Sequence, residues 1–399
     1  MAHLAIKGGT PYRTKPFPDW TMITPADEQG LSKVYDQDDW GIDGPKNKEF
    51  QEKFAAYSHA KHCLTVANGT VSIELILRGL GIGRGDEVIV PPYTFIATIS
   101  SLIYAGVTPV FADIDKDTFQ MSARSAAKCI TPRTKAIMPV YVGGRPADLD
   151  AFSALCKEHN LYLIGDAAQA VGSTFNGKGI STYAVATSIS CQNSKNLTCG
   201  EGGIILTDDD ELYERIFTML HGGMDADGNY TTLGLYNGMS ELQASILLTQ
   251  LENLPAQIEK RMKNAAYLDE QFAKFPFVYA MKQDERITHN SYHLYLLGIH
   301  EDKLQGVSRN DFLAAVQAEG IPLYAGYVPV YSFDCLASDY TKKCIGGEIN
   351  LKPETPNAET LGYHEGSWLY HSVLLGEQKD MDDIVGAVKK VYEHLDELK

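Results

Sequence analysis

The strongest constraint on the fold is an alternation of short apolar runs with helical patterns between residues 60 and 250. Runs rich in Val, Ile and Tyr predict β-strands at 87–92, 107–114, 136–142, 161–167, 185–190 and 202–208. Helical patterns lie between several of these runs, at 70–80, 94–105, 148–159 and 210–220. Because such alternation is typical of a mostly parallel sheet covered on both faces, the sequence predicts an α/β fold. Ligands of these sheets bind at the carboxyl ends of the strands, so the residues that follow each strand are the candidates for function.

A second, smaller domain is predicted beyond a long helical segment at 239–272, where the pattern changes. The chain has 399 residues, a length typical of two domains. The later part predicts a half-buried strand and two helices, at 292–300, 308–321 and 382–398. We therefore expect a large domain over residues 1–255 and a smaller α+β domain over residues 256–399.

Charge and cysteine content exclude several classes of function. Acidic residues outnumber basic ones 51 to 35, and a net charge of −16 opposes binding to nucleic acid or to an anionic membrane surface. No apolar run reaches membrane-spanning length, and the first residues lack the apolar core of a signal peptide. The seven cysteines form no Cys-x-x-Cys pair, so we expect neither a disulfide framework nor a metal site. A cytoplasmic location is the expectation.

One loop contains a lysine in an unusual setting. The stretch "SCQNSKNLTCGEGG" places Lys195 among small polar residues, between the strands predicted at 185–190 and 202–208. An isolated loop lysine is usually solvated, and this interpretation stays open for Lys195 taken alone. Asp166 ends the preceding apolar strand, and a carboxylate there needs a cationic partner to remain ionised away from water. Its alternative interpretation is a turn-forming residue.

Two further strand ends complete a pattern. Asn68, Gly69 and Thr70 directly precede a predicted helix, where backbone N–H groups and a hydroxyl can hold a phosphate; an ordinary N-cap turn is the alternative. Phe95 lies at another helix start and is either core or a stacking surface. A reactive lysine, an acid, a phosphate cup and an aromatic face are together what pyridoxal phosphate (PLP) requires. Their order along successive strands favours a PLP site.

A competing nucleotide motif fails. The stretch "GSTFNGKG" at 172–179 has the Gly-x4-Gly-Lys spacing of a P-loop. It ends in Gly179, where the motif needs a hydroxyl for Mg²⁺. The sequence therefore does not predict a nucleotide site there.

Several motifs resemble a known family. The segments "NGTVSIELILRGLGIGRGDEVIVPPYTFIAT", "GDAAQAVGS" and "CQNSKNLTCGEGGIILTDD" resemble the DegT/StrS-type sugar aminotransferases, which are PLP enzymes of fold type I. The resemblance extends from residues 38–57 to the C-terminal helix. Within the family, "NSYHLYLL", "YVPVYSF" and "WLYHSVLL" are most similar to cyclitol (scyllo-inosose type) aminotransferases and 3-amino-5-hydroxybenzoate synthases.

The resemblance implies a role for each site residue. Lys195 matches the lysine that binds PLP covalently, Asp166 the partner of the pyridine nitrogen, and Phe95 the stacking ring. Four more residues match cofactor contacts, at the phosphate or at the phenolic oxygen of the ring: Gly69, Thr70, Gln169 and Ser190. Asn237 matches a residue that reaches the phosphate in the neighbouring subunit, since family members are usually homodimers with the active site at the interface. Candidates for substrate contact are Trp40, His293, Tyr331 and His371.

The implied activity is a ping-pong transamination from L-glutamine or L-glutamate to a keto-sugar or keto-cyclitol, in the biosynthesis of an amino sugar or aminocyclitol. Few Lys or Arg residues cluster near the expected site, which favours an uncharged acceptor. Some relatives replace the lysine with histidine and are dehydratases, so Lys195 favours transamination. An aromatising synthase, a sugar dehydratase and a non-catalytic regulator of the same fold remain alternatives.

Overall fold

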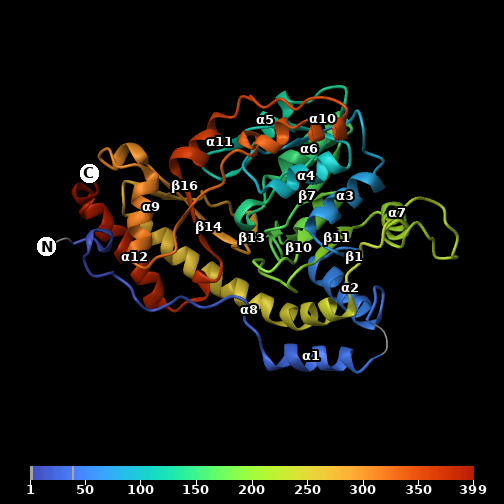
Figure 1. Cartoon of the computed structure of the whole chain (residues 1–399), viewed down its shortest axis with the longest axis horizontal. Helices are drawn as coiled ribbons and strands as arrows, with labels where there is room; N and C mark the ends of the chain where they lie inside the picture. Colours follow the sequence, from blue (N-terminus) through green and yellow to red (C-terminus); the bar gives the residue numbers. More distant parts are fainter. Residues whose placement is uncertain (1–2, 38–39) are drawn as a thin grey trace.

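A computed structural model describes residues 3–37 and 40–399, so the first two residues of the 38–57 segment lie outside it. Its centre is a seven-stranded sheet (Figure 1). The strand order is β1 (His62–Val66), β11 (Gly203–Thr207), β10 (Ala186–Ser190), β7 (Tyr162–Asp166), β6 (Thr134–Ile137), β2 (Glu87–Val90), β3 (Thr108–Phe111). Pairing is parallel from β10 to β3, and β11 is antiparallel to both of its neighbours. The predicted α/β fold with a mostly parallel sheet is confirmed.

Helices cover both faces of this sheet and form two separate cores. One core contains residues of α3 (Gly69–Gly79), α4 (Ile96–Tyr104) and α7 (Asp210–Leu220) packed on Val88, Val90 and Ile164. The other contains residues of α2 (Pro45–Ser58), α6 (Leu149–His159) and α8 (Glu241–Phe272) packed on Ile89 and Leu163. Successive residues of β2 thus point to opposite cores, because side chains alternate along a strand. Burial on both faces explains the continuously apolar runs.

The C-terminal part is built on a smaller antiparallel sheet. Its order is β12 (Val278–Ala280), β14 (Leu294–Ile299), β16 (Gly366–Tyr370), β15 (Tyr324–Ala325). The prediction of a half-buried strand at 292–300 was wrong in one respect, since all six residues of β14 are buried. Tyr295 and Leu297 pack into a core shared with α9 (Arg309–Ala318) and α12 (Gln378–Glu393), whereas Leu294 and Leu296 pack into another core with Trp368. Alternate residues of β14 do point to opposite faces of the sheet, as expected. Each face is covered by its own apolar core, however, so all six residues are buried.

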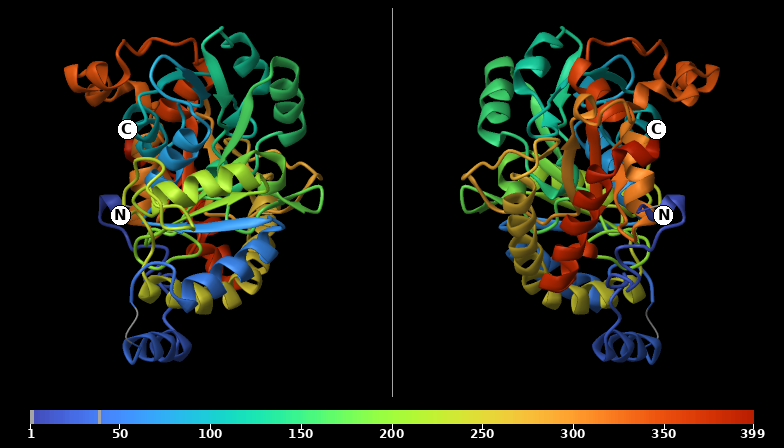
Figure 2. Two further views of the ribbon diagram at one scale, coloured as in Figure 1. Left: turned by 90° about the vertical axis from the view of Figure 1, so that its right-hand side faces the viewer. Right: turned by 90° about the vertical axis from the view of Figure 1, so that its left-hand side faces the viewer.

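Helix α8 connects the two parts along the lower side of the molecule in Figure 1. Pro255, at the predicted domain boundary, lies inside this continuous helix. A division of the chain at this residue stays a prediction. Helix α1 (Pro25–Tyr35) packs on α8 and lies below it in both views of Figure 2. No helix within the described residues has the length and apolar character needed to cross a membrane.

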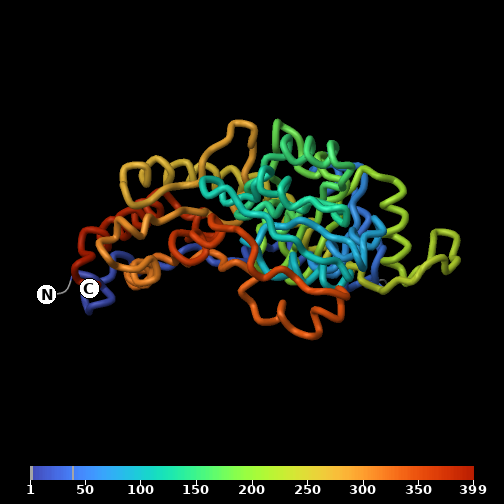
Figure 3. Tube along the Cα trace, turned by 90° about the horizontal axis from the view of Figure 1, so that it is seen from above, coloured from blue at the N-terminus to red at the C-terminus, as the bar shows by residue number. Residues whose placement is uncertain are grey.

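The remaining elements are short. They are β4 (Ile114–Asp115), β5 (Gln120–Met121), α5 (Ala123–Lys128), β8 (Thr174–Phe175), β9 (Lys178–Gly179), β13 (Ile287–His289), α10 (Asp339–Ile345) and α11 (Pro356–Thr360). Between α7 and α8 the chain forms an arm, residues 221–240, whose tip projects from the body in Figures 1 and 3.

Candidate active site

A pocket of ≈ 580 Å³ lies at the carboxyl ends of the central strands. Most of the residues predicted from the sequence to bind the cofactor line it, namely Gly69, Thr70, Phe95, Asp166, Gln169, Ser190 and Lys195. The substrate candidate His293 also lines it. This is the position at which open α/β sheets bind ligands, because loops and helix N-termini converge there.

The N-terminus of α3 forms the first wall of the pocket. Asn68 caps the helix, and its side chain accepts a 2.9 Å hydrogen bond from the Val71 backbone N–H. Gly69 lies against β10 so closely that an added Cβ would come within 2.9 Å of the Cβ of Ser190. Hydroxyl groups of Thr70 and Ser190 flank this helix end. Helix N-termini present free N–H groups and partial positive charge, so the wall suits a phosphate.

Asp166 is the buried acid of the site. It is 2% exposed, and its carboxylate accepts hydrogen bonds from the Thr98 hydroxyl at 2.8 Å and the Ala168 backbone N–H at 3.1 Å. Burial raises the pKa of Asp166, while these hydrogen bonds and the charge of Lys195 act in the opposite direction. Within residues 3–37 and 40–399, no cationic side chain lies within ion-pair distance of this carboxylate. A cation in the pocket would therefore complete the environment of Asp166.

Lys195 is the nucleophile candidate. It follows a turn closed by a 2.8 Å hydrogen bond from its own backbone N–H to the Gln192 carbonyl. Burial lowers the pKa of the Lys195 amine to about 8, although the neighbouring Asp166 and Cys191 favour the charged form. A substantial fraction of the amine is consequently neutral near pH 7–8, as attack on an aldehyde requires.

Two more residues complete the pocket wall. Phe95, at the N-cap of α4, lines the pocket and is 58% exposed, so its ring offers an open face on which a flat group can stack. Gln169 is buried and fixed, because its Oε1 accepts from the Gly143 N–H at 2.8 Å and its Nε2 donates to the Tyr327 hydroxyl at 3.0 Å.

The sequence did not predict part of the pocket. Trp368 and Tyr370 of β16 line it together with Tyr327, which follows β15, and the ring centroids of Tyr327 and Trp368 are 4.7 Å apart. Thr98, which donates to Asp166, was also missed. The motifs "YVPVYSF" and "WLYHSVLL" pointed to the right segments, but only the fold shows which of their aromatic residues face the pocket.

Four predicted residues lie away from the pocket lining. The Trp40 indole donates to the Val34 carbonyl at 3.0 Å. The Tyr331 hydroxyl bonds to the Thr355 hydroxyl and the Glu359 carboxylate. The other two are Asn237, on the arm, and His371, whose ring contacts the Ser194 carbonyl in the loop that carries Lys195.

Solved structures with this architecture define the class. The structure of 3-amino-5-hydroxybenzoic acid synthase matches with a TM-score of 0.85 and 28% identity, over 96% of this chain and 99% of that one. The PLP form of Spr1654 from Streptococcus pneumoniae matches with a TM-score of 0.83 and 27% identity, over 96% and 100% of the two chains. The fold is that of the fold type I PLP-dependent transferases.

The family follows from the sequence comparison. Residues 23–389 match the DegT/DnrJ/EryC1/StrS aminotransferase family. An L-glutamine:2-deoxy-scyllo-inosose aminotransferase from Micromonospora echinospora is 33% identical over 100% of both chains. This chain belongs to the DegT/DnrJ/EryC1/StrS aminotransferase family.

Proposed function

We propose that the chain transfers the amino group of L-glutamine to a keto-cyclitol, or to a related uncharged keto-sugar, with PLP held by Lys195. The observation that carries the proposal is the pairing of a half-buried lysine, whose amine has a lowered pKa of about 8, with a buried acid in one pocket. L-glutamine is the donor in the name of the Micromonospora echinospora relative.

The residues of the pocket fit PLP on grounds independent of the comparisons. The wall formed by Gly69, Thr70 and Ser190 suits the phosphate, and the exposed ring of Phe95 offers a stacking face. Among the described residues no cationic side chain lies within ion-pair distance of Asp166, and a pyridinium nitrogen would supply that partner. When bound, PLP supplies an electron sink for the charge that develops at the α-carbon of the amino donor.

Three residues of the pocket would have separate roles in the reaction. With PLP bound, Lys195 Nζ would hold it at rest. The freed amine would accept the α-proton of the donor in the first half-reaction and deliver a proton to the carbon that receives the amine in the second. Asp166 would stabilise positive charge on the ring nitrogen. Gln169 is held in place by Gly143 and Tyr327 and would contact the cofactor from a fixed position.

The charge of the pocket favours an uncharged acceptor. Among the described residues that line it, Lys195 has the only cationic side chain other than the titratable His293, whose pKa is held low by burial. Glu201 adds a carboxylate at the wall. A diphosphate group would find no arginine there, whereas the aromatic rings of Tyr327, Trp368 and Tyr370 suit the apolar face of a polyol ring.

A homodimer is part of the proposal. The arm exposes large apolar side chains, with Tyr230 73%, Leu233 94%, Leu235 68% and Tyr236 71% exposed. Such a protruding apolar patch is typical of a surface that a partner covers. Asn237 lies at the base of this arm and does not line the pocket of its own chain, which is consistent with a role in the pocket of a second copy.

The test is spectroscopic. The PLP-loaded protein should absorb near ~400–430 nm, as expected for lysine-bound PLP. Addition of L-glutamine alone should remove this band, because the amino group passes to the cofactor. A protein that stays colourless after addition of PLP would contradict the proposal, and a band that glutamine leaves unchanged would favour the synthase or dehydratase alternatives.

A further inference from the structure

Both neighbours of Lys195 in the chain are held by histidines from the C-terminal part. His371 Nε2 lies 2.9 Å from the carbonyl oxygen of Ser194. His293 Nδ1 lies 3.1 Å from Oδ1 of Asn196. The Ser194 carbonyl, before the lysine, is therefore bonded to a residue 177 positions away in the sequence. The Asn196 side chain, after the lysine, is bonded to a residue 97 positions away.

The hydrogen bonds require opposite tautomers of the two rings. A carbonyl oxygen can only accept, so His371 must carry its proton on Nε2. The Asn196 amide donates from Nδ2 to the Ser291 carbonyl at 2.7 Å, which leaves its Oδ1 to accept from His293 Nδ1. His293 is thus protonated on Nδ1, and each ring contacts the loop through a different nitrogen.

The two histidines form one rigid unit. His293 precedes β14 and His371 follows β16, two strands that pair side by side. The backbone N–H of His371 donates to the His293 carbonyl at 3.1 Å, and the rings stack with centroids 5.5 Å apart. Both side chains are buried, at 3% and 2% exposure. Burial lowers the pKa of both rings, of His371 to about 3, so both are neutral donors near pH 7.

The loop that carries Lys195 depends on such anchors. Residues 191–202 connect β10 to β11 without helix or strand. Bonds within the loop, such as Thr198 Oγ1 to the Cys191 carbonyl at 3.1 Å, shape the turn but do not fix it relative to the C-terminal sheet. Contacts from outside the loop do. The two histidines, next to β14 and β16, bond to the residues on either side of the lysine. They act beside two further bonds, from the Asn196 amide to the Ser291 carbonyl at 2.7 Å and from the Trp20 indole to the Asn193 carbonyl at 3.0 Å.

We propose that His293 and His371 are positioning residues that clamp the lysine loop from the C-terminal sheet, each through one defined ring nitrogen. The inference rests on the proposed function, in which Lys195 holds PLP. It gives His371 a task other than the substrate contact expected from the sequence. The clamp sets the place of the Lys195 amine relative to the pocket that β14 and β16 help to line.

Amide substitutions test the two nitrogens separately. The amide nitrogen of asparagine can take the place of histidine Nδ1, and that of glutamine the place of Nε2. The variants are His371→Gln, His371→Asn, His293→Asn and His293→Gln. The measurement is the rate at which cofactor-free protein captures added PLP, followed by stopped-flow absorbance near ~400–430 nm, with thermal unfolding recorded for each variant.

The expected result is that the two positions prefer opposite amides, glutamine at 371 and asparagine at 293. His371→Gln and His293→Asn should capture PLP within about threefold of the parent rate, whereas His371→Asn and His293→Gln should be slowed by about tenfold or more, since small misplacements of a reacting group are costly. A merely structural role would make both amides equally harmful at each position. The exposed His364, changed to the same two residues, is the matched control and should leave the rate unchanged.

Each other outcome has a defined meaning. Equal rates for the two amides at both positions, or the same preferred amide at both, would overturn the clamp, while the proposed function would stand if the parent captures PLP. A folded parent that captures no PLP would overturn the proposed function and with it this inference.

Discussion

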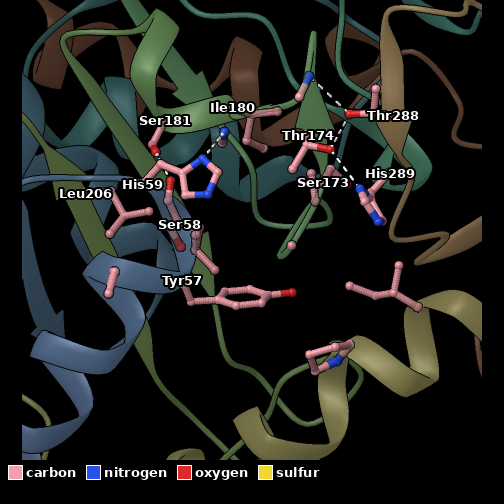
Figure 4. A pocket seen from close by; sticks show the side chains of 18 of the residues that line it. Tyr57, Ser58, His59, Ser173, Thr174, Ile180, Ser181, Leu206, Thr288 and His289 are labelled. Atoms are coloured by element: carbon pink, nitrogen blue, oxygen red, sulfur yellow. Dashed lines mark hydrogen bonds between the residues drawn. The ribbon is translucent and has the colours of Figure 1, made fainter.

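Two pockets of similar size differ in the charged groups that line them. The active-site pocket has a volume of ≈ 580 Å³, and a second pocket of ≈ 520 Å³ lies between the end of α2, the middle of α8 and strands β8 and β9 (Figure 4). The second contains His59, Thr174 and His289, residue types that also occur in active sites. Volume and composition alone therefore do not distinguish the two.

Several polar groups of the second pocket are paired with one another, although the pocket is also lined by Tyr57, whose phenol has its pKa raised by burial to about 12. His59 Nδ1 accepts from the Gly179 N–H at 3.1 Å, and the Thr174 hydroxyl bonds to Thr288 at 2.7 Å and to His289 at 3.1 Å, as Figure 4 shows. The first pocket instead brings together two groups of opposite charge, Lys195 and Asp166, which have perturbed pKa values and no ion-pair partner in the described part of the chain. Groups held ready for a ligand, rather than space, mark the functional pocket.

The second pocket also explains the rejected nucleotide motif. Part of its lining comes from the segment 172–179, whose spacing resembles a P-loop. This segment forms the short β8–β9 hairpin, and only a single 3₁₀ turn, Ile180–Tyr183, follows it. Without the N-terminus of an α-helix, the glycine spacing does not make a phosphate site.

The largest difference between the pockets should appear on removal of the lysine. Lys195→Ala should abolish the ~400–430 nm band and lower turnover by at least about 10³-fold, because both the covalent attachment and the proton transfer are lost. His289→Ala, in the second pocket, should leave turnover within about twofold of the parent. Comparable losses in the two variants, measured by steady-state kinetics, would contradict the assignment.

The buried acid should give the next largest effect. Asp166→Asn keeps the size of the side chain and removes the charge that stabilises a cationic ring, so turnover should fall by about 10²-fold or more. Glu259→Gln, an equivalent change beside the second pocket, should have no such effect. The comparison is made at saturating PLP, and normal turnover in Asp166→Asn would exclude the proposed role of the carboxylate.

The lysine should also give the first pocket a distinctive pH dependence. Only the neutral amine captures PLP, so the capture rate should rise with pH and level off above a midpoint near the Lys195 pKa of about 8. Below this midpoint the rate should change about tenfold per pH unit. A midpoint near the ordinary lysine value of 10.5 would mean that burial does not activate this amine.

The smallest effect is expected from the aromatic wall. Phe95→Leu removes a stacking face and should weaken PLP binding by about three- to tenfold, the scale of one aromatic contact. Tyr57→Phe, which alters the aromatic residue that points into the second pocket, should leave PLP affinity unchanged. Equilibrium titration with PLP compares the two, and equal affinities in Phe95→Leu and the parent would argue against stacking on this ring.

The sequence predicted the features that depend on short stretches of chain. Lys195, Asp166 and the start of α3 were singled out because each lies at or shortly after the end of an apolar strand, and parallel strands bring their ends to one edge. The full burial of β14 was not predictable, since its second face is covered by residues distant in the sequence, such as Trp368.

The parts of the site that the sequence did not predict depend on contacts between distant segments. Tyr327 binds Gln169 across 158 positions, and His371 binds the carbonyl of Ser194 across 177. No local pattern signals such partners, because the residue types are common and the spacing carries no period. The motifs around Tyr327 and His371 indicated which segments belong to the site. The contacts of the individual side chains could be seen only in the folded structure.

The most direct test of the central claim follows one nitrogen atom. L-glutamine labelled with ¹⁵N at the α-amino group is incubated with the PLP-loaded protein and a keto-cyclitol, and the product is examined by mass spectrometry. The proposed function predicts an aminocyclitol that carries the label, with none formed by Lys195→Ala. An unlabelled product, or none after a screen of keto-cyclitols and keto-sugars, would contradict it.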